Sequence, residues 1–181
     1  MSVEKAAVRL ATSADIPALR ALIEASVRKL QAEDYSESQR MAALGGVFGV
    51  DPMMIEDGTY FVAELESKIG ACGGWSRRAT PFGSDRSPAR DDRVLDPKVD
   101  AAKIRALFVD PSCARLGLGS LILHTCEAAA KAAGFHLAEL TATLTGTKLF
   151  SVRGYVAAEE IWIPLANGEK LPVVRMTKRL G

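Results

Sequence analysis

Apolar and polar positions follow two periods along the chain, which predict short strands interrupted by a few helices. Residues 8–12 alternate with a period of two and predict an opening strand. Residues 16–30 carry apolar side chains every three to four positions, which predicts an amphipathic helix. Thr12 and Asp15 form a capping-box pattern before it, and Pro17 stands in the first turn, where a missing N–H is tolerated.

The rest of the chain continues this alternation of strands and helices. The pattern predicts a helix at 36–44, strands at 59–66 and 69–77 joined by a tight turn, a strand at 103–109, a helix at 119–133, a strand at 136–142, a short helix at 145–152, and strands at 155–164 and 171–178. The order β-α-α-β-β-β-α-β-α-β-β predicts an α/β fold with one mixed sheet, neither doubly wound nor a barrel. The length of 181 residues suits a single domain over 1–181.

The segment 78–100 is the one long stretch without periodicity. It is polar and rich in Pro, Gly, Asp and Arg, which predicts a long loop insertion. Loops of this length in a compact domain are usually functional or disordered. Three interpretations stay open: a lid over a cleft, a contact between subunits, or a solvated mobile insertion.

Charge and composition exclude several classes of partner. With 23 basic and 22 acidic residues the net charge is +1, so nothing favours nucleic acid or an anionic membrane. No apolar run reaches the roughly 18 residues of a spanning helix, and residues 1–10 have no apolar core of a secretory signal. The three cysteines are widely spaced, which predicts reduced thiols and a cytoplasmic location. With no CxxC and two histidines, the sequence predicts no metal site.

Residues 107–121 carry the clearest chemical signal. An apolar strand runs through a glycine-bearing turn into a long helix, and the N–H groups that begin a helix have no intrahelical partner. Gly117 and Gly119 let the backbone approach a ligand closely, and Arg115 adds a cation. This arrangement predicts an anion site, most naturally for a pyrophosphate.

The same segment departs from two familiar nucleotide motifs. No Lys-Ser or Lys-Thr follows Gly119, so the nucleotide P-loop is absent. The dinucleotide pattern GxGxxG is incomplete, because Ile122 occupies the place of the third glycine. A strand-turn-helix with no ligand, or a nucleotide-binding α/β protein, stays open at this point.

Taken with its surroundings, the segment resembles motif A of the GNAT N-acetyltransferase superfamily, with Ala114 at the usual Gln/Arg position and Arg115 next to it. The resemblance covers nearly the whole chain, because the opening strand and helix, the hairpin, motif A and a late short helix before Gly154 and Tyr155 follow the family's order. It implies a sheet whose central parallel strands are splayed, with acetyl-CoA as co-substrate in the gap.

The resemblance also assigns residues to the coenzyme. Backbone groups of Phe108 and Val109 would hold the pantetheine arm, and the N–H groups from Arg115 to Ser120 would hold the pyrophosphate. The implied acetyl-CoA site comprises Phe108, Val109, Ala114, Arg115, Leu116, Gly117, Leu118, Gly119, Ser120, Thr145, Lys148 and Phe150.

Residues 143–155 resemble motif B of the family, with Phe150 where relatives usually carry the tyrosine that protonates the leaving thiolate. Phenylalanine cannot donate a proton, so no catalytic acid is assigned. Nor is a base assigned, because Lys103 stands where some relatives have a glutamate. The predicted function is transfer of an acetyl group to a small-molecule amine by direct attack; the alternative is an acetyl-CoA-binding sensor or pseudoenzyme.

The acceptor itself is not identified by the sequence. In the family's fold, the end of the predicted hairpin faces the acceptor cleft, which makes Trp75, Ser76 and Arg77 candidate acceptor contacts; the alternative is a packed tryptophan beside solvated charges. The resemblance also allows a homodimer.

Overall fold

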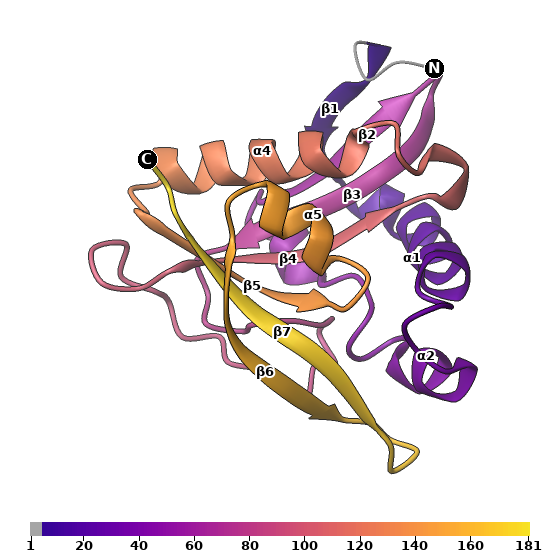
Figure 1. Cartoon of the computed structure of the whole chain (residues 1–181). Helices are drawn as coiled ribbons and strands as arrows, with labels where there is room; N and C mark the ends of the chain where they lie inside the picture. The colour runs from indigo at the N-terminus through magenta and orange to yellow at the C-terminus, as the bar shows by residue number, and fades with distance from the viewer. Residues whose placement is uncertain (1–4) are drawn as a thin grey trace.

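The computed structural model describes residues 5–181, so the first four residues of the N-terminal segment considered above lie outside it. Seven strands form one mixed sheet in the order β1-β2-β3-β4-β5-β7-β6 (Figure 1). The strands are β1 (Ala7–Leu10), β2 (Tyr60–Leu65), β3 (Lys68–Ser76), β4 (Ala102–Val109), β5 (Leu137–Thr143), β6 (Val156–Pro164) and β7 (Lys170–Arg179). The helices are α1 (Ile16–Leu30), α2 (Glu37–Ala43), α3 (Pro52–Glu56), α4 (Leu118–Ala132) and α5 (Thr147–Val152).

The predicted fold class and order of elements are confirmed. The structure adds the five-residue helix α3, which apolar periodicity cannot reveal because it spans little more than one turn. Asp51 caps this helix by accepting the N–H of Met53 at 3.1 Å, and Pro52 begins it. The hairpin turn lies at Glu66 and Ser67, which both have positive φ.

The central parallel strands separate after a short stretch of pairing. β4 and β5 pair only from Ala102 with Ala138 to Ile104 with Leu140. Beyond Ile104, β5 stays paired with β7, while β4 stays paired with β3. The edge of β4 from residue 105 to 109 that faces β5 therefore has no neighbouring strand, which leaves a gap in the middle of the sheet.

A bulge in β4 accompanies this separation. Gly74 pairs with Arg105 and Cys72 with Phe108, so two residues of β4 lie opposite Gly73 alone. One of these two, Ala106, has a φ of 51°, a conformation that costs a non-glycine residue energy. The hydroxyl of the buried Tyr60 donates a hydrogen bond to the carbonyl of Ala106 at 3.0 Å, which helps to stabilise the bulge.

Buried side chains form one hydrophobic core on each face of the sheet. One core lies between the sheet and α4, and the other lies between the sheet and α1 to α3. The glycines of β3 allow this close packing: a Cβ at Gly73 would lie 2.8 Å from Ile122, and one at Gly74 would lie 2.6 Å from Met54. The glycine-rich strand therefore reflects helices that approach the sheet closely on both faces.

The segment 78–100 is held against the helices that follow α1. Arg78 forms two hydrogen bonds with Asp57, at 2.8 and 2.9 Å, and pairs with Val94 across the loop. Arg90 bonds to the buried Asp51 at 2.9 Å, and Ser84 donates its backbone N–H to Gly46 at 2.9 Å. These contacts attach the segment to the rest of the fold, which favours an ordered loop over a solvated mobile insertion.

Tyr35 joins the α1–α2 connection to two strands. Its hydroxyl donates to the carbonyl of Pro172 at 2.7 Å and accepts the backbone N–H of Leu144 at 2.9 Å. By contrast, the hydroxyl of the equally buried Tyr155 has no hydrogen-bond partner among residues 5–181.

We expect Tyr35→Phe to lower the free energy of unfolding by about 1–3 kcal/mol, because it leaves a partly buried N–H and a partly buried carbonyl unpaired. Tyr155→Phe is the matched control, and its loss should stay below about 0.5 kcal/mol because no hydrogen bond disappears. Equilibrium urea unfolding measures both variants. Equal losses in the two would contradict the hydrogen-bonding role given to Tyr35.

Candidate functional site

A groove of about 570 Å³ opens at the gap between β4 and β5. Its walls come from the end of α1, the open edge of β4, the turn before α4, the first turn of α4, the end of β5 and the start of α5. The lining residues are Ser26, Leu30, Gln31, Leu107, Phe108, Val109, Cys113, Ala114, Arg115, Gly117, Leu118, Gly119, Ser120, Thr143, Thr145, Gly146, Lys148, Leu149 and Val152.

The start of α4 gives one end of this groove a positive character. α4 follows Gly117, whose φ is 88°, and no side chain caps its first N–H groups. Arg115 and Lys148 also line the groove, whereas no carboxylate does. Free amides, the positive end of the helix dipole and two cations together can hold an anionic group such as a pyrophosphate.

Most residues assigned to acetyl-CoA from the sequence lie in this groove. Ten of the twelve line it, and the exceptions are Leu116 and Phe150. Leu116 is partly buried and packs against the core on the α4 side. Phe150 is buried and lines a neighbouring cavity instead, where its ring packs edge-on against Tyr155 at a centroid distance of 5.9 Å.

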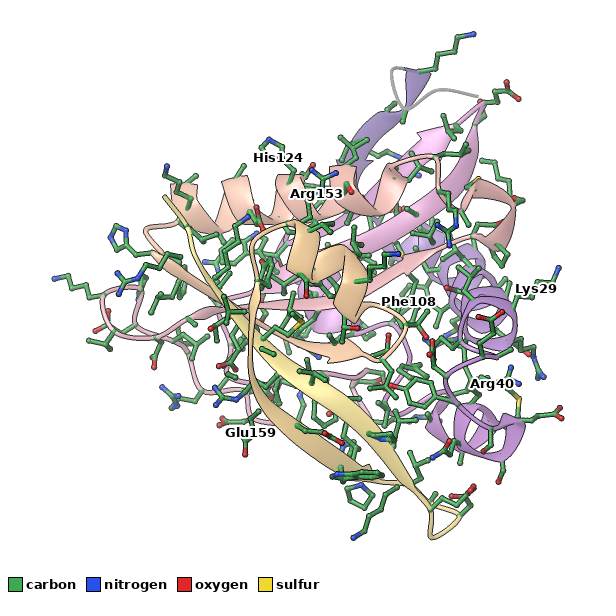
Figure 2. All side chains as sticks on the ribbon, in the orientation of Figure 1. Lys29, Arg40, Phe108, His124, Arg153 and Glu159 are labelled. Carbon is green, nitrogen blue, oxygen red and sulfur yellow. The ribbon has the colours of Figure 1, made fainter. Side chains whose placement is uncertain are left out.

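That neighbouring cavity has a volume of about 120 Å³ and lies further along the gap. It shares Gln31, Leu107, Phe108, Thr143, Gly146 and Leu149 with the groove. Pro81, Phe82 and Gly83 of the 78–100 segment form one wall. In Figure 2, Phe108 lies between the α1–α2 side of the molecule, marked by Lys29 and Arg40, and the α4–α5 side, marked by His124 and Arg153. The groove and the cavity therefore meet at the splayed strands.

Arg105 is the charged residue that lines the small cavity. Its side chain is 1% exposed, and its Nη2 donates to Asp51 at 3.0 Å and to the carbonyl of Gly83 at 2.6 Å. Arg90 binds the same Asp51 oxygen from the other side at 2.9 Å. Burial lowers the pKa of Arg105, and the neighbouring Asp51 opposes that shift. The guanidinium stays charged, because arginine does not lose its proton in proteins.

The structure does not bring the candidate acceptor contacts Trp75, Ser76 and Arg77 to either cavity. Trp75 is buried in the core on the α4 side, with its ring edge-on to Phe135 and the guanidinium of Arg77 5.7 Å from its centroid. Ser76 is buried and accepts the backbone N–H of Arg78. This geometry agrees with the alternative given in the sequence analysis, in which the tryptophan is packed inside the fold.

Sequence reasoning missed Gln31 and Arg105, which do line the cavity. For Arg105 a signal existed, since a charged residue inside an otherwise apolar central strand needs a buried partner. Gln31 follows the last turn of α1 and had no such signal.

Neither cavity contains a side chain suited to act as a general base. In the part of the chain that the structure describes, no aspartate, glutamate, histidine or tyrosine lines the groove or the small cavity. Within residues 5–181, no cluster of three or more His, Cys, Asp or Glu residues has a geometry that could hold a metal ion. The three cysteines are buried and unbridged, and Cys113 lines the groove.

Comparison with known proteins identifies close structural counterparts. The model of the acetyltransferase (GNAT) family matches residues 21–155. A GCN5-related N-acetyltransferase from Rhodopseudomonas palustris superposes with a TM-score of 0.73 at 24% identity, covering 99% of this chain and 98% of that one. No curated protein matches the sequence.

Two further structures with the same fold contain the coenzyme. PaiA N-acetyltransferase from Thermoplasma acidophilum, in complex with coenzyme A, has a TM-score of 0.65 at 12% identity and covers 96% of this chain and 98% of that one. YncA from Salmonella typhimurium, with its cofactor acetyl-CoA, has a TM-score of 0.64 at 15% identity and covers 97% and 94%.

The Arg78–Asp57 pair that anchors the cavity wall predicts a pH dependence. The hydrogen bonds from Arg78 hold the pKa of Asp57 below its usual 3.8. This stabilisation is present above the unfolded pKa and is lost as the pH falls through the folded value. We expect Asp57→Asn to lower the free energy of unfolding by about 1 kcal/mol above pH 5, with a deficit that shrinks below pH 4.

Urea unfolding from pH 3 to pH 7 measures this difference. Asp85→Asn is the control. Asp85 lies in the 78–100 segment that also carries Arg78, is exposed, and forms no ion pair within residues 5–181. A deficit that is independent of pH would argue against the ion pair as its source.

Proposed function

Because the chain belongs to the GNAT acetyltransferase family, we propose that it is an acetyl-CoA-dependent N-acetyltransferase that acts on a small-molecule amine. The observation that carries this proposal is the pair of adjoining spaces at the gap between β4 and β5. The larger space, of about 570 Å³, has the positive end that the pyrophosphate of a coenzyme needs. The smaller space adjoins it and has room for a small acceptor.

The residues of the groove fit the parts of the coenzyme. The open edge of β4 at Phe108 and Val109 offers backbone groups to the pantetheine arm, in the manner of an added strand. The first amides of α4, with Arg115 and Lys148, suit the pyrophosphate. Phe150, which lines only the small cavity, would approach the acetyl end rather than the phosphates.

The chemistry that bound acetyl-CoA supplies is an activated acetyl group. The protein's own part is to hold the amine beside the thioester, and to offer backbone N–H groups near the bulge of β4 to the carbonyl oxygen as it gains negative charge. Because no aspartate, glutamate, histidine or tyrosine of residues 5–181 lines the cavities, the amine would lose its proton to water.

A second candidate function follows from Phe150. With phenylalanine at the usual position of the acid, the protein would bind acetyl-CoA and turn it over slowly, as expected of a sensor or pseudoenzyme.

None of the helices in residues 5–181 has the length and apolar character needed to span a membrane. The cytoplasmic location and the homodimer stay predictions.

Calorimetry with acetyl-CoA, followed by a thiol-release assay on the same sample with a panel of amines, tests both functions. Micromolar binding with release that depends on an amine supports the transferase. Binding without release on any amine favours the sensor, and the absence of binding contradicts both.

Ser120→Asp separates coenzyme binding from folding. Ser120 lines the groove in the first turn of α4, where a negative charge favours the helix dipole but repels a phosphate. We expect the affinity for acetyl-CoA to fall about tenfold or more while the free energy of unfolding is unchanged or rises by up to about 1 kcal/mol.

Ser120→Asn is the matched control, with nearly the same shape and no charge. It should retain affinity within a few fold, and calorimetry with thermal melting gives both quantities. Unchanged affinity in Ser120→Asp would place the pyrophosphate elsewhere.

Phe150→Tyr restores the usual donor. The ring lines the small cavity, so under this proposal an added hydroxyl would lie near the reacting atoms. We expect the turnover number to rise about tenfold or more, since a positioned acid typically contributes at least that much, with little change in affinity for acetyl-CoA. The absence of any gain would indicate that water already protonates the thiolate efficiently.

A further inference from the structure

Unpaired polar atoms mark the small cavity. Among residues 5–181, three buried side-chain polar atoms have no hydrogen-bond partner: Gln31 Oε1, Arg105 Nε and Tyr155 Oη. Two of these residues, Gln31 and Arg105, line the same cavity of about 120 Å³. Both are more than nine-tenths buried, with 4% and 3% of their surfaces exposed. Unpaired buried polar atoms are costly, so their concentration at one cavity points to a ligand.

The two atoms have complementary requirements. Arg105 Nε carries a hydrogen and needs an acceptor, ideally an anionic oxygen. Gln31 Oε1 needs a donor, which an amine N–H supplies. A ligand that pairs with both therefore has an amine at one end and an anionic oxygen at the other.

Their positions assign an order to these two ends. Gln31 lines both the coenzyme groove and the small cavity, so it lies where the two spaces meet. Arg105 lines the small cavity alone. An amine beside Gln31 would face the coenzyme, and an anionic group beside Arg105 would lie away from it.

The surrounding charges favour an anion over a second cation. Arg105 and Arg90 share the single carboxylate of Asp51, which is 2% exposed. Asp92, the other partner of Arg90, is 50% exposed, so water screens its charge. The two fully buried charges, Arg105 and Asp51, therefore balance each other, and Arg90 is 25% exposed. Arg105 lines the cavity, whereas no carboxylate of residues 5–181 lines it to receive a second ammonium group.

We propose that the acceptor is a small amino acid, with its amino group at Gln31 and its carboxylate at Arg105. This inference rests on the proposed acetyl transfer and adds the class of acceptor. The cavity volume limits the acceptor to a small side chain. Polyamines and other polycationic amines fit poorly.

In the transfer, the amine nitrogen forms a bond to the acetyl carbonyl carbon as the carbon–sulfur bond breaks. The sulfur leaves with the bonding electron pair and takes up one proton to give free coenzyme A. An ammonium substrate loses two protons, one of which balances that thiol, and the other goes to water.

Matched acceptors test the inference on the unmodified protein. The kcat/KM is measured for alanine, alaninamide and ethylamine, and for leucine, leucinamide and isopentylamine. We expect alanine to exceed alaninamide and ethylamine at least tenfold, and leucine, whose side chain is larger, to react more slowly than alanine. The amide has the more easily deprotonated amine, so reactivity alone would favour the amide.

Two variants assign the preference to Arg105. In Arg105→Gln the advantage of the amino acid over its amide should fall to within about threefold, with affinity for acetyl-CoA unchanged because Arg105 does not line the groove. Arg90→Gln is the matched control: it removes the other partner of Asp51, lines neither cavity, and should keep the preference. If Arg105→Gln does not fold, Arg105→Lys replaces it, since its single ammonium pairs with Asp51 and cannot supply Nε.

The results distinguish the two levels of the proposal. Acetyl transfer at equal efficiency to amino acids, amides and simple amines overturns the amino-acid acceptor and leaves the transferase in place. If acetyl-CoA binds but no acceptor reacts, calorimetry of alanine and leucine against the protein saturated with coenzyme A decides, and the absence of binding overturns the inference. If acetyl-CoA itself does not bind, the proposed function fails and the acceptor assignment fails with it.

Discussion

The separation of β4 from β5 after Ile104 is the constraint on which the site depends. Two parallel strands that stay paired would close the middle of the sheet and leave no room for a ligand. Here β3 holds β4 on one side and β7 holds β5 on the other, so each strand stays paired on its far edge. The bulge at Ala106, bonded by the hydroxyl of Tyr60, accompanies the change in direction. The groove and the small cavity both open from this gap.

The cluster of Arg105, Asp51 and Arg90 connects the gap between β4 and β5 to the 78–100 segment, which forms one wall of the small cavity. Arg105 enters the interior from β4, where burial alone would be prohibitive, and Asp51 compensates it from the start of α3. Arg90 brings the 78–100 segment to the same carboxylate, and Gly83 offers its carbonyl to Arg105. One carboxylate thus joins a strand, a short helix and a long loop. The polarity of the small cavity and the position of its wall follow from the same three contacts.

The sequence predicts the frame of this molecule better than its interior. The periodic segments, the glycine-bearing turn at Gly117 and the order of elements are local patterns, and each was predicted. Pairing across 54 positions, as between Asp51 and Arg105, leaves no local trace, and neither does the cavity beside Gln31. Trp75 shows the converse. It lies at the expected end of the hairpin, but its ring packs edge-on against Phe135 in the core.

Hydrogen exchange with and without acetyl-CoA tests the central claim, that the splayed strands hold the coenzyme, most directly. At saturating ligand we predict slower exchange at the backbone amides of residues 107–121 and 143–150, where the open edge of β4, the start of α4 and the start of α5 meet. The β6–β7 hairpin, which lines no part of the groove, should be unchanged. Protection confined to other parts of the chain, or none at saturation, would contradict the account.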